Sequence, residues 1–217
     1  MKNCGVFALL INEYQSNKPI PTESDETQIE NWCSKLGLNT PHFLHNGSTV
    51  VGSGSIQNRL EMMKNTITTS GYDSVILFTS SHGSDNNTLL SDNASIEWKY
   101  FIYCLKDIQT LKYIVMVCDQ CTTYGKGGNK LVFNPQYKRN SVGIPYQIIS
   151  AKHYSKVPIR EKSVLITAFV DTFKDKFIRT NTIETLMKIA VAKDPDHNIS
   201  NVEAIGNKTE NFVINFK

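Results

Sequence analysis

The sequence of 217 residues predicts an α/β fold in which a mostly parallel central sheet carries helices on both faces. Several short runs are continuously apolar, which is the pattern of strands buried on both faces. Segments with apolar residues at helical spacing lie between these runs. The composition, 40% hydrophobic and 20% charged, excludes a disordered, collagen-like or coiled-coil chain.

The first expected helix begins at Thr22 or Ser24, because both residue types cap helices and acidic residues follow them. Gly37 is expected to end it. Further helices are expected around residues 56–63, 98–108 and 183–191. The expected strands are residues 5–11, 73–79, 112–118 and 164–170, with a final edge strand at residues 211–216.

Three segments lack this periodicity. Residues 12–24 are expected to form a loop, and the Gly- and Ser-rich residues 46–55 are expected to be mobile. Residues 122–162 show no clear pattern, and a segment of this length inside one domain is often functional or disordered. No internal repeat is apparent, so residues 1–217 are expected to form a single domain.

Charge and cysteine content limit the partners that are expected. The 23 basic and 20 acidic residues are mixed along the chain, so neither nucleic acid nor a membrane surface is expected as a partner. No apolar run approaches the roughly 18 residues of a membrane span, and no signal-peptide cleavage site follows the first run. Five cysteines without metal-site spacing predict free thiols, a cytoplasmic location, and no metal or cofactor. Four histidines without ligand spacing are expected at the surface: His42, His45, His153 and His197.

Two reactive residues follow expected strands. His82 comes after residues 73–79, and Cys121 comes after residues 112–118. In parallel sheets, active residues gather at the carboxyl ends of the strands. A thiol attacks a carbonyl as its thiolate, and a nearby imidazole can hold it in that form. The pattern is therefore typical of a cysteine hydrolase in which Cys121 is the nucleophile and His82 transfers the proton.

Gly83 follows the histidine, and its N–H together with that of Cys121 could bind an oxyanion. Other interpretations stay open from the residues alone. A single cysteine at a strand end is more often a small core residue, and a single histidine is more often a loop residue with satisfied hydrogen bonds. Cys118 and Cys121 also form a C-x-x-C pair, although redox motifs of this kind open a helix near a proline.

Several segments resemble the caspase family of cysteine endopeptidases. V-I-L-F-T-S-S-H-G (75–83) resembles the strand that ends in S-H-G, and K-Y-I-V-M-V-C-D-Q-C (112–121) resembles K-P-K-L-F-F-I-Q-A-C. T-E-S-D-E-T-Q-I-E-N-W-C-S-K-L-G-L (22–38) resembles the first helix, and S-V-L-I-T-A-F-V-D (163–171) resembles the first strand of the small subunit. The resemblance implies a caspase-like three-layer sandwich with a large-subunit-like part (1–121), an irregular linker region (122–162) and a small-subunit-like part (163–217).

The resemblance also implies substrate-binding residues. Arg179 of Phe177-Ile178-Arg179 stands where the family has S-W-R, whereas the other arginines of the family's aspartate pocket are absent. Asp119 replaces the family's glutamine, and this D-x-C pattern is similar to metacaspases and paracaspases, which cleave after Arg or Lys. In those relatives an acid at the position of Asp25 joins the pocket. Asp119 could instead pair with Arg179 or cap a neighbouring loop.

The function expected is a caspase-like cysteine endopeptidase in cell-death or related signalling, with a polypeptide substrate. The alternative is an inactive homologue that binds and regulates an active caspase, and a remoter one is another hydrolase with the same dyad. The final strand could pair with its copy or with another caspase to form a dimer. No aspartate occurs between Asp119 and Asp171, so the chain is expected to work uncut or to be cut after a basic residue.

Overall fold

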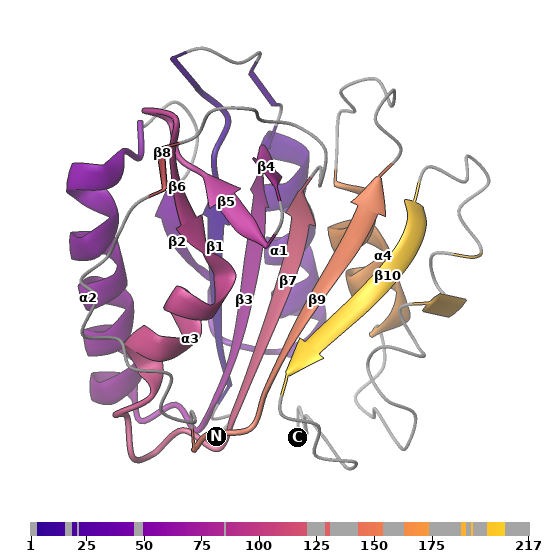
Figure 1. Ribbon diagram of the computed structural model, residues 1–217. Coiled ribbons are helices and arrows are strands. Elements are labelled where there is room, and N and C mark those ends of the chain that lie inside the picture. The colour runs from indigo at the N-terminus through magenta and orange to yellow at the C-terminus, as the bar shows by residue number, and fades with distance from the viewer. Residues whose placement is uncertain are drawn as a thin grey trace.

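A six-stranded sheet runs through the centre of the molecule, with helices on both faces (Figure 1). In strand order, the sheet contains β10 (Ile199–Gly206), β9 (Tyr146–His153), β7 (Tyr113–Gln120), β3 (Ser74–Ser81), β1 (Cys4–Leu10) and β2 (His42–His45). All neighbours pair in parallel except β10, which is antiparallel to β9. The computed structural model describes residues 4–15, 19–20, 22–45, 50–84, 86–120, 129–130, 143–153, 163–173, 188–189, 192 and 199–206.

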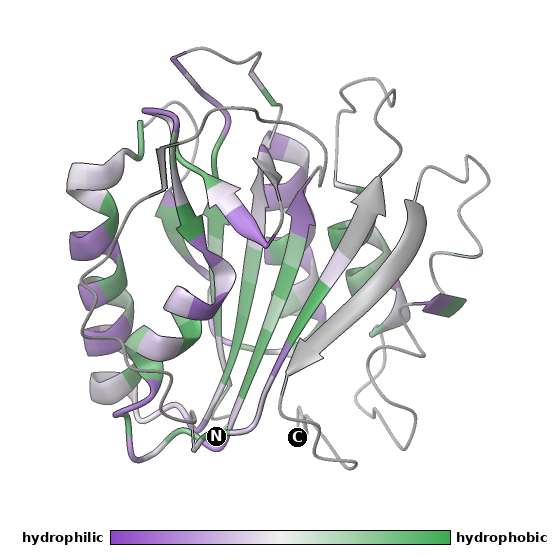
Figure 2. Ribbon diagram, viewed as in Figure 1, coloured by the Kyte–Doolittle hydropathy of each residue, from purple (hydrophilic) through white to green (hydrophobic). Residues whose placement is uncertain are grey.

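The helices divide the core into two halves. Helices α1 (Glu23–Leu36) and α4 (Val164–Thr172) cover one face, and α2 (Ser53–Ser70) and α3 (Trp98–Leu105) cover the other. Because side chains alternate along a strand, Val6 and Ala8 of β1 pack toward α1 and α4, whereas Phe7 and Leu9 pack toward α2 and α3. The central strands are apolar along most of their length (Figure 2), as expected for a sheet buried on both faces. The predicted fold class is confirmed.

A second, smaller sheet lies near the carboxyl edge of the parallel strands. It has the order β4 (Gly83–Ser84), β5 (Asn87–Leu89), β6 (Ala94–Glu97) and β8 (Asn129–Lys130). β4 follows β3 after a single residue, and β6 leads directly into α3. This small sheet therefore connects the end of β3 to the helix layer on the α2/α3 face (Figure 1).

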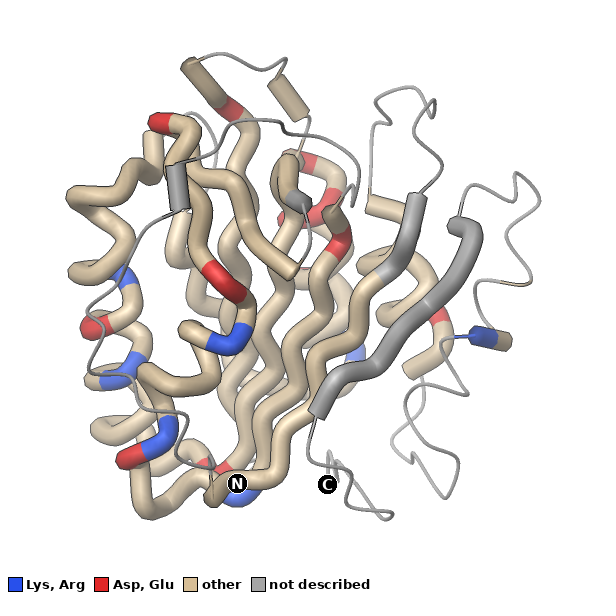
Figure 3. Tube along the Cα trace, in the orientation of Figure 1, with Lys and Arg blue, Asp and Glu red and all other residues tan. Residues whose placement is uncertain are grey.

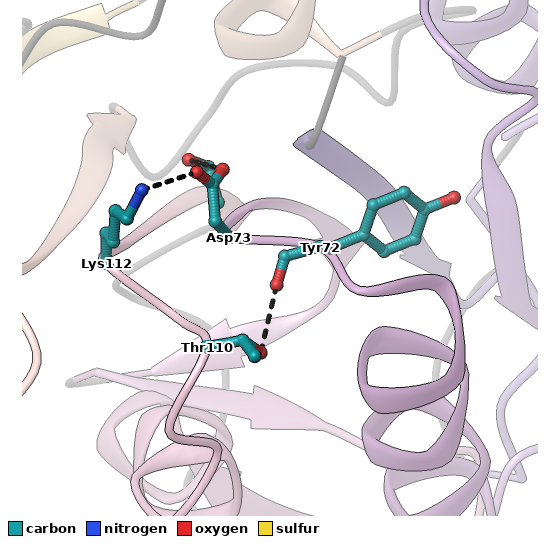
Figure 4. Close-up of polar contacts among 5 residues, drawn as sticks. Tyr72, Asp73, Thr110 and Lys112 are labelled. Atoms are coloured by element: carbon teal, nitrogen blue, oxygen red, sulfur yellow. Dashed lines mark hydrogen bonds and ion pairs between the residues drawn. The ribbon is translucent and has the colours of Figure 1, made fainter. Parts of the chain in front are cut away.

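At the opposite edge, short contacts fix where β3 and β7 begin (Figure 4). The backbone N–H of Lys112 donates to the carbonyl of Asp73 at 2.6 Å, and the ammonium of Lys112 lies 3.0 Å from the Asp73 carboxylate. The hydroxyl of Thr110 donates to the carbonyl of Tyr72 at 3.4 Å. Because the ion pair is exposed, it contributes little stability. The backbone contact, however, joins the starts of β3 and β7 in the parallel register that continues to Ser81 and Gln120 at their carboxyl ends.

The predicted strands at 5–11, 73–79 and 112–118 are confirmed as β1, β3 and β7, and the first three predicted helices are confirmed as α1, α2 and α3. Gly37 ends α1 with a left-handed φ of 61°, as expected for this cap. Helix α2 begins at Ser53, so the end of the segment 46–55 is helical rather than a mobile loop. The predicted helix at 183–191 and strand at 211–216 lie largely or wholly outside the described residues.

The strand predicted at residues 164–170 is wrong, because these residues form helix α4. Ser163 caps this helix by accepting a hydrogen bond from the N–H of Ile166 at 2.9 Å. Leu165 and Phe169 are buried one helical turn apart, and a helix that is apolar on most sides reads in sequence like a buried strand. The resemblance of residues 163–171 to the first small-subunit strand therefore does not hold.

Strand β9 pairs with β7 in the sheet. Its residues belong to the segment 122–162, for which the sequence predicts no regular structure. Its residues Ile148, Ile149 and Ser150 are buried in the sheet. Its neighbour β10 forms the edge of the sheet. None of the helices in the described ranges is long and apolar enough to cross a membrane.

Candidate functional site

The carboxyl ends of β3 and β7 lie side by side at one edge of the sheet. Their parallel register pairs Ser80 with Asp119 and ends with Ser81 opposite Gln120. His82 immediately follows β3 and is only 7% exposed. Cys121, the residue after Gln120, lies outside the described residues. The sheet therefore positions His82 at the end of β3. Cys121 is the residue that follows the neighbouring strand β7 in the sequence.

Contacts on two sides hold His82 in place. Its backbone N–H donates to the phenolic oxygen of Tyr14 at 2.8 Å, and that hydroxyl donates to the carbonyl of Ile11 at 2.8 Å. The rings of Tyr14 and His82 lie with their centroids 4.6 Å apart and are inclined by 55°. The carbonyl of His82 accepts hydrogen bonds from the N–H of Leu89 and the hydroxyl of Ser81. Burial raises the pKa of Tyr14, so its hydroxyl keeps the proton that it donates.

Gly83 is required by close packing. A Cβ atom at this position would lie 2.4 Å from the carbonyl oxygen of Asn87 and 2.6 Å from Oε1 of Gln120. Both distances are far below a normal contact, so no larger residue fits without moving the backbone. The predicted oxyanion role of its N–H is not tested by these contacts. They do show that Gly83 lies against the side chain of Gln120, the residue before Cys121.

Asp119 caps helix α4. Its Oδ2 accepts a hydrogen bond from the N–H of Leu165 at 2.9 Å and a short one from the hydroxyl of Ser163. Asp119 is 8% exposed. Negative charge at a helix N-terminus is stabilising because the backbone N–H groups there have no partners within the helix. Asp119 therefore acts as a cap, although it caps helix α4 rather than the neighbouring loop considered from the sequence, and it connects the end of β7 to α4.

Asp25 lies beside the same cap and is fully buried. Its Oδ1 accepts the N–H of Ser163 at 2.7 Å. Burial raises the pKa of Asp25 to about 7, and the negative charges of Asp119 and Glu23 add to this rise. The N–H of Ser163 and the hydroxyl of Ser80 act in the opposite direction. Figure 3 shows acidic segments together at the start of α1 and the end of β7. The two predicted substrate-binding acids, Asp25 and Asp119, are thus brought together at Ser163.

Arg179, the third predicted substrate-binding residue, lies outside the described residues. Its assignment depended on a strand at 163–171, which the structure replaces with a helix. The strand beside β7 is β9, and the tripeptide Pro158-Ile159-Arg160 follows it in the sequence. Arg160 thus follows the strand beside β7 in the sequence, and it too lies outside the described residues.

Two other reactive side chains among the described residues are buried. Cys118 is fully buried in β7, and burial raises the pKa of its thiol, which does not suit a redox C-x-x-C role. His45 is 2% exposed, so its predicted place at the surface is wrong. Within the described ranges, no group of three or more His, Cys, Asp or Glu residues could hold a metal ion.

Comparison with known proteins defines the fold. No protein-family model and no curated protein matches the sequence. Among solved structures, the chain is similar to the crystal structure of caspase-1 from Spodoptera frugiperda, with a TM-score of 0.74 and 15% sequence identity. The similarity covers 99% of this chain and 90% of that chain. The protein therefore has a caspase-like α/β fold.

Proposed function

We propose that the protein is a caspase-like cysteine endopeptidase that cleaves peptide bonds with a dyad of Cys121 and His82. The register of β3 and β7 is the observation that carries this proposal. Ser81 is paired with Gln120, so His82 and Cys121 are the next residues after a parallel pair. Residues that leave adjacent parallel strands at the same level start from the same edge of the sheet, within reach of a common substrate.

The chemistry requires four groups. The thiolate of Cys121 attacks the scissile carbonyl, and the tetrahedral oxyanion accepts hydrogen bonds from the N–H groups of Gly83 and Cys121. The imidazolium of His82 gives its proton to the leaving amine as the C–N bond breaks. A water molecule then gives a proton to His82 and attacks the acyl-enzyme, whose C–S bond breaks to release the carboxyl product and restore the Cys121 thiolate beside the His82 imidazolium. Burial of His82 against Tyr14 supports this role, because a fixed imidazole needs little reorganisation during the reaction.

The acids beside the site favour a basic residue before the scissile bond. Asp25 and Asp119 are both buried next to Ser163, and a carboxylate of a substrate would meet like charges with little solvent between them. A guanidinium or ammonium group would instead lower the cost of keeping Asp25 charged. The resemblance implies Arg179 as the pocket arginine, and we add Arg160, which follows β9 in the sequence, as a second candidate. Either arginine would balance one of the two acids.

A peptide library varied at the residue before the scissile bond tests the proposal. We expect the parent protein to cleave after Arg or Lys, and Cys121→Ala to reduce cleavage by at least about a thousandfold. Asp25→Asn is expected to weaken the preference for basic residues. Glu30→Gln, a change to an exposed acid on the same helix α1, is the matched control and is expected to cleave like the parent.

Two outcomes would contradict the proposal. Efficient cleavage after aspartate would exclude the acidic pocket. Absence of turnover, combined with tight binding to an active caspase, would favour the alternative of an inactive regulatory homologue.

A further inference from the structure

The side chain of Gln120 is buried between the two segments that lead to the proposed dyad. Gln120 is the last residue of β7 and directly precedes Cys121 in the sequence. The residue is 3% exposed. A buried amide is costly unless each of its polar atoms has a partner, so its surroundings show which structures it connects.

Each polar atom of this amide has a partner. Oε1 accepts the indole N–H of Trp98 at 2.8 Å, while Nε2 donates to the hydroxyl of Thr88 at 2.6 Å and to that of Thr79 at 3.3 Å. An indole N–H can only donate, so the chemistry fixes which end of the amide faces Trp98. The partners come from β3, β5 and α3, and Trp98, Thr88 and Thr79 are themselves almost fully buried. The orientation of the amide is therefore determined from three directions.

The same amide also lies against the histidine segment. Oε1 of Gln120 would be 2.6 Å, and its Cβ 3.2 Å, from a Cβ atom placed on Gly83. Gly83 follows His82, whose carbonyl accepts the N–H of Leu89 in β5. Gln120 therefore contacts the chain one residue after His82 and is itself one residue before Cys121.

We propose that Gln120 is a positioning residue that sets the separation of Cys121 and His82 by connecting the end of β7 to Gly83, Thr88 and Trp98. The proposal rests on the proposed function, because it assigns Gln120 a role in that dyad. The family segment resembled by residues 112–121 has alanine at this position, so the contacts of the amide, rather than the resemblance, carry the assignment. A misplacement of about 1 Å between reacting groups can lower a rate by about a hundredfold.

The test compares alkylation of Cys121 with cleavage. The rate at which iodoacetamide modifies Cys121, followed by peptide mass spectrometry as a function of pH, reports the thiolate and its coupling to His82. The variants are Gln120→Met, which keeps the length without the amide, Trp98→Phe, which removes one donor to it, and His82→Ala as the reference for a lost dyad. Trp32→Phe is the matched control, because Trp32 donates its indole N–H to the carbonyl of Phe173 at 2.8 Å on the opposite face of the sheet.

We expect Gln120→Met to shift the alkylation profile toward that of His82→Ala and to lower kcat by about 10- to 100-fold with little change in KM. Trp98→Phe should shift both readouts in the same direction by a smaller factor, and Trp32→Phe should leave both unchanged. Trp98→Phe also carries the test if Gln120→Met does not fold.

A parent-like profile and kcat in Gln120→Met, or equal effects of Trp98→Phe and Trp32→Phe, would overturn the positioning role while leaving the dyad in place. If His82→Ala itself left the alkylation profile unchanged, the dyad, and with it the role of Gln120, would be wrong.

Discussion

The phenolic oxygen of Tyr14 accepts the backbone N–H of His82 at 2.8 Å, and the two rings lie 4.6 Å apart. The histidine is thus held through its main chain as well as its side chain. The residues are 68 positions apart in the sequence, and Tyr14 lies in the loop that follows β1. The contact connects the end of β1 to the end of β3 at the proposed catalytic edge.

Tyr14→Phe is expected to destabilise the fold by about 1–3 kcal/mol, because it leaves a buried N–H without an acceptor. It should also slow cleavage by allowing His82 to move. Urea unfolding and kcat measure the two effects. Tyr72→Phe is the matched control, since the Tyr72 hydroxyl accepts from Asn39 at 3.1 Å near the amino edge of the sheet. Equal losses of kcat in both variants would argue against a specific effect on His82.

Gly83→Ala is expected to destabilise the fold by about 1–3 kcal/mol or more, because the added methyl would overlap the Asn87 carbonyl and the Gln120 amide. Gly54→Ala provides the comparison, since a Cβ there meets nothing within 4 Å and the position is helical. That change should be neutral or slightly stabilising. Similar unfolding midpoints for the two variants would contradict the close packing at Gly83.

His45 makes stability depend on acidity. Burial, together with the positive charge of Arg59, lowers its pKa to about 4, and both ring nitrogens lack a hydrogen-bond partner within the described structure. The unfolded chain binds this proton near the ordinary pKa of 6.5 and the folded chain only near 4. The contribution of neutral, buried His45 to the free energy of unfolding is therefore present above pH 6.5. It is lost as the pH falls from 6.5 to 4, and the total loss is roughly 3 kcal/mol.

Urea unfolding between pH 4 and 7 measures this slope, and His45→Leu should flatten it. A parallel slope in the variant would show that other groups cause the acid sensitivity.

Asp25 makes stability depend on pH in the opposite direction to His45. Its pKa is raised from 3.8 to about 7, so its contribution to stability is complete below pH 3.8 and is lost as the pH rises through 7. Asp25→Asn keeps an oxygen for the N–H of Ser163 and removes the buried charge. We expect this variant to exceed the parent in unfolding free energy at pH 8, by up to roughly 4 kcal/mol, and to match it near pH 4. A constant difference across this range would mean that Asp25 does not titrate with folding.

The central strands could be predicted because parallel strands buried on both faces read as continuous apolar runs, as in β1, β3 and β7. Helix α4 could not be distinguished from a strand, because its cap and tertiary packing, rather than its composition, determine its state. Strand β9 is not recognisable from the sequence, because Gln147 and Ser150 interrupt its apolar pattern.

The same difference applies to the site. His82 and Gly83 follow an apolar run and belong to a recognisable motif, so the sequence indicated them. Tyr14 and Ser163 could not be recognised, since each acquires its role through a residue far away in the chain. Ser163 meets Asp119 across 44 positions of sequence. Such contacts exist only once the sheet has formed.

The pairing of β7 with β9 has a consequence for a chain that has been nicked. β9 hydrogen-bonds along β7 from Ile114 opposite Tyr146 to Cys118 opposite Ser150, and Ser163 is tied to both Asp25 and Asp119. Scission anywhere between residues 121 and 142 would cut none of these connections. The two fragments would separate on a denaturing gel yet travel together as one particle under native conditions.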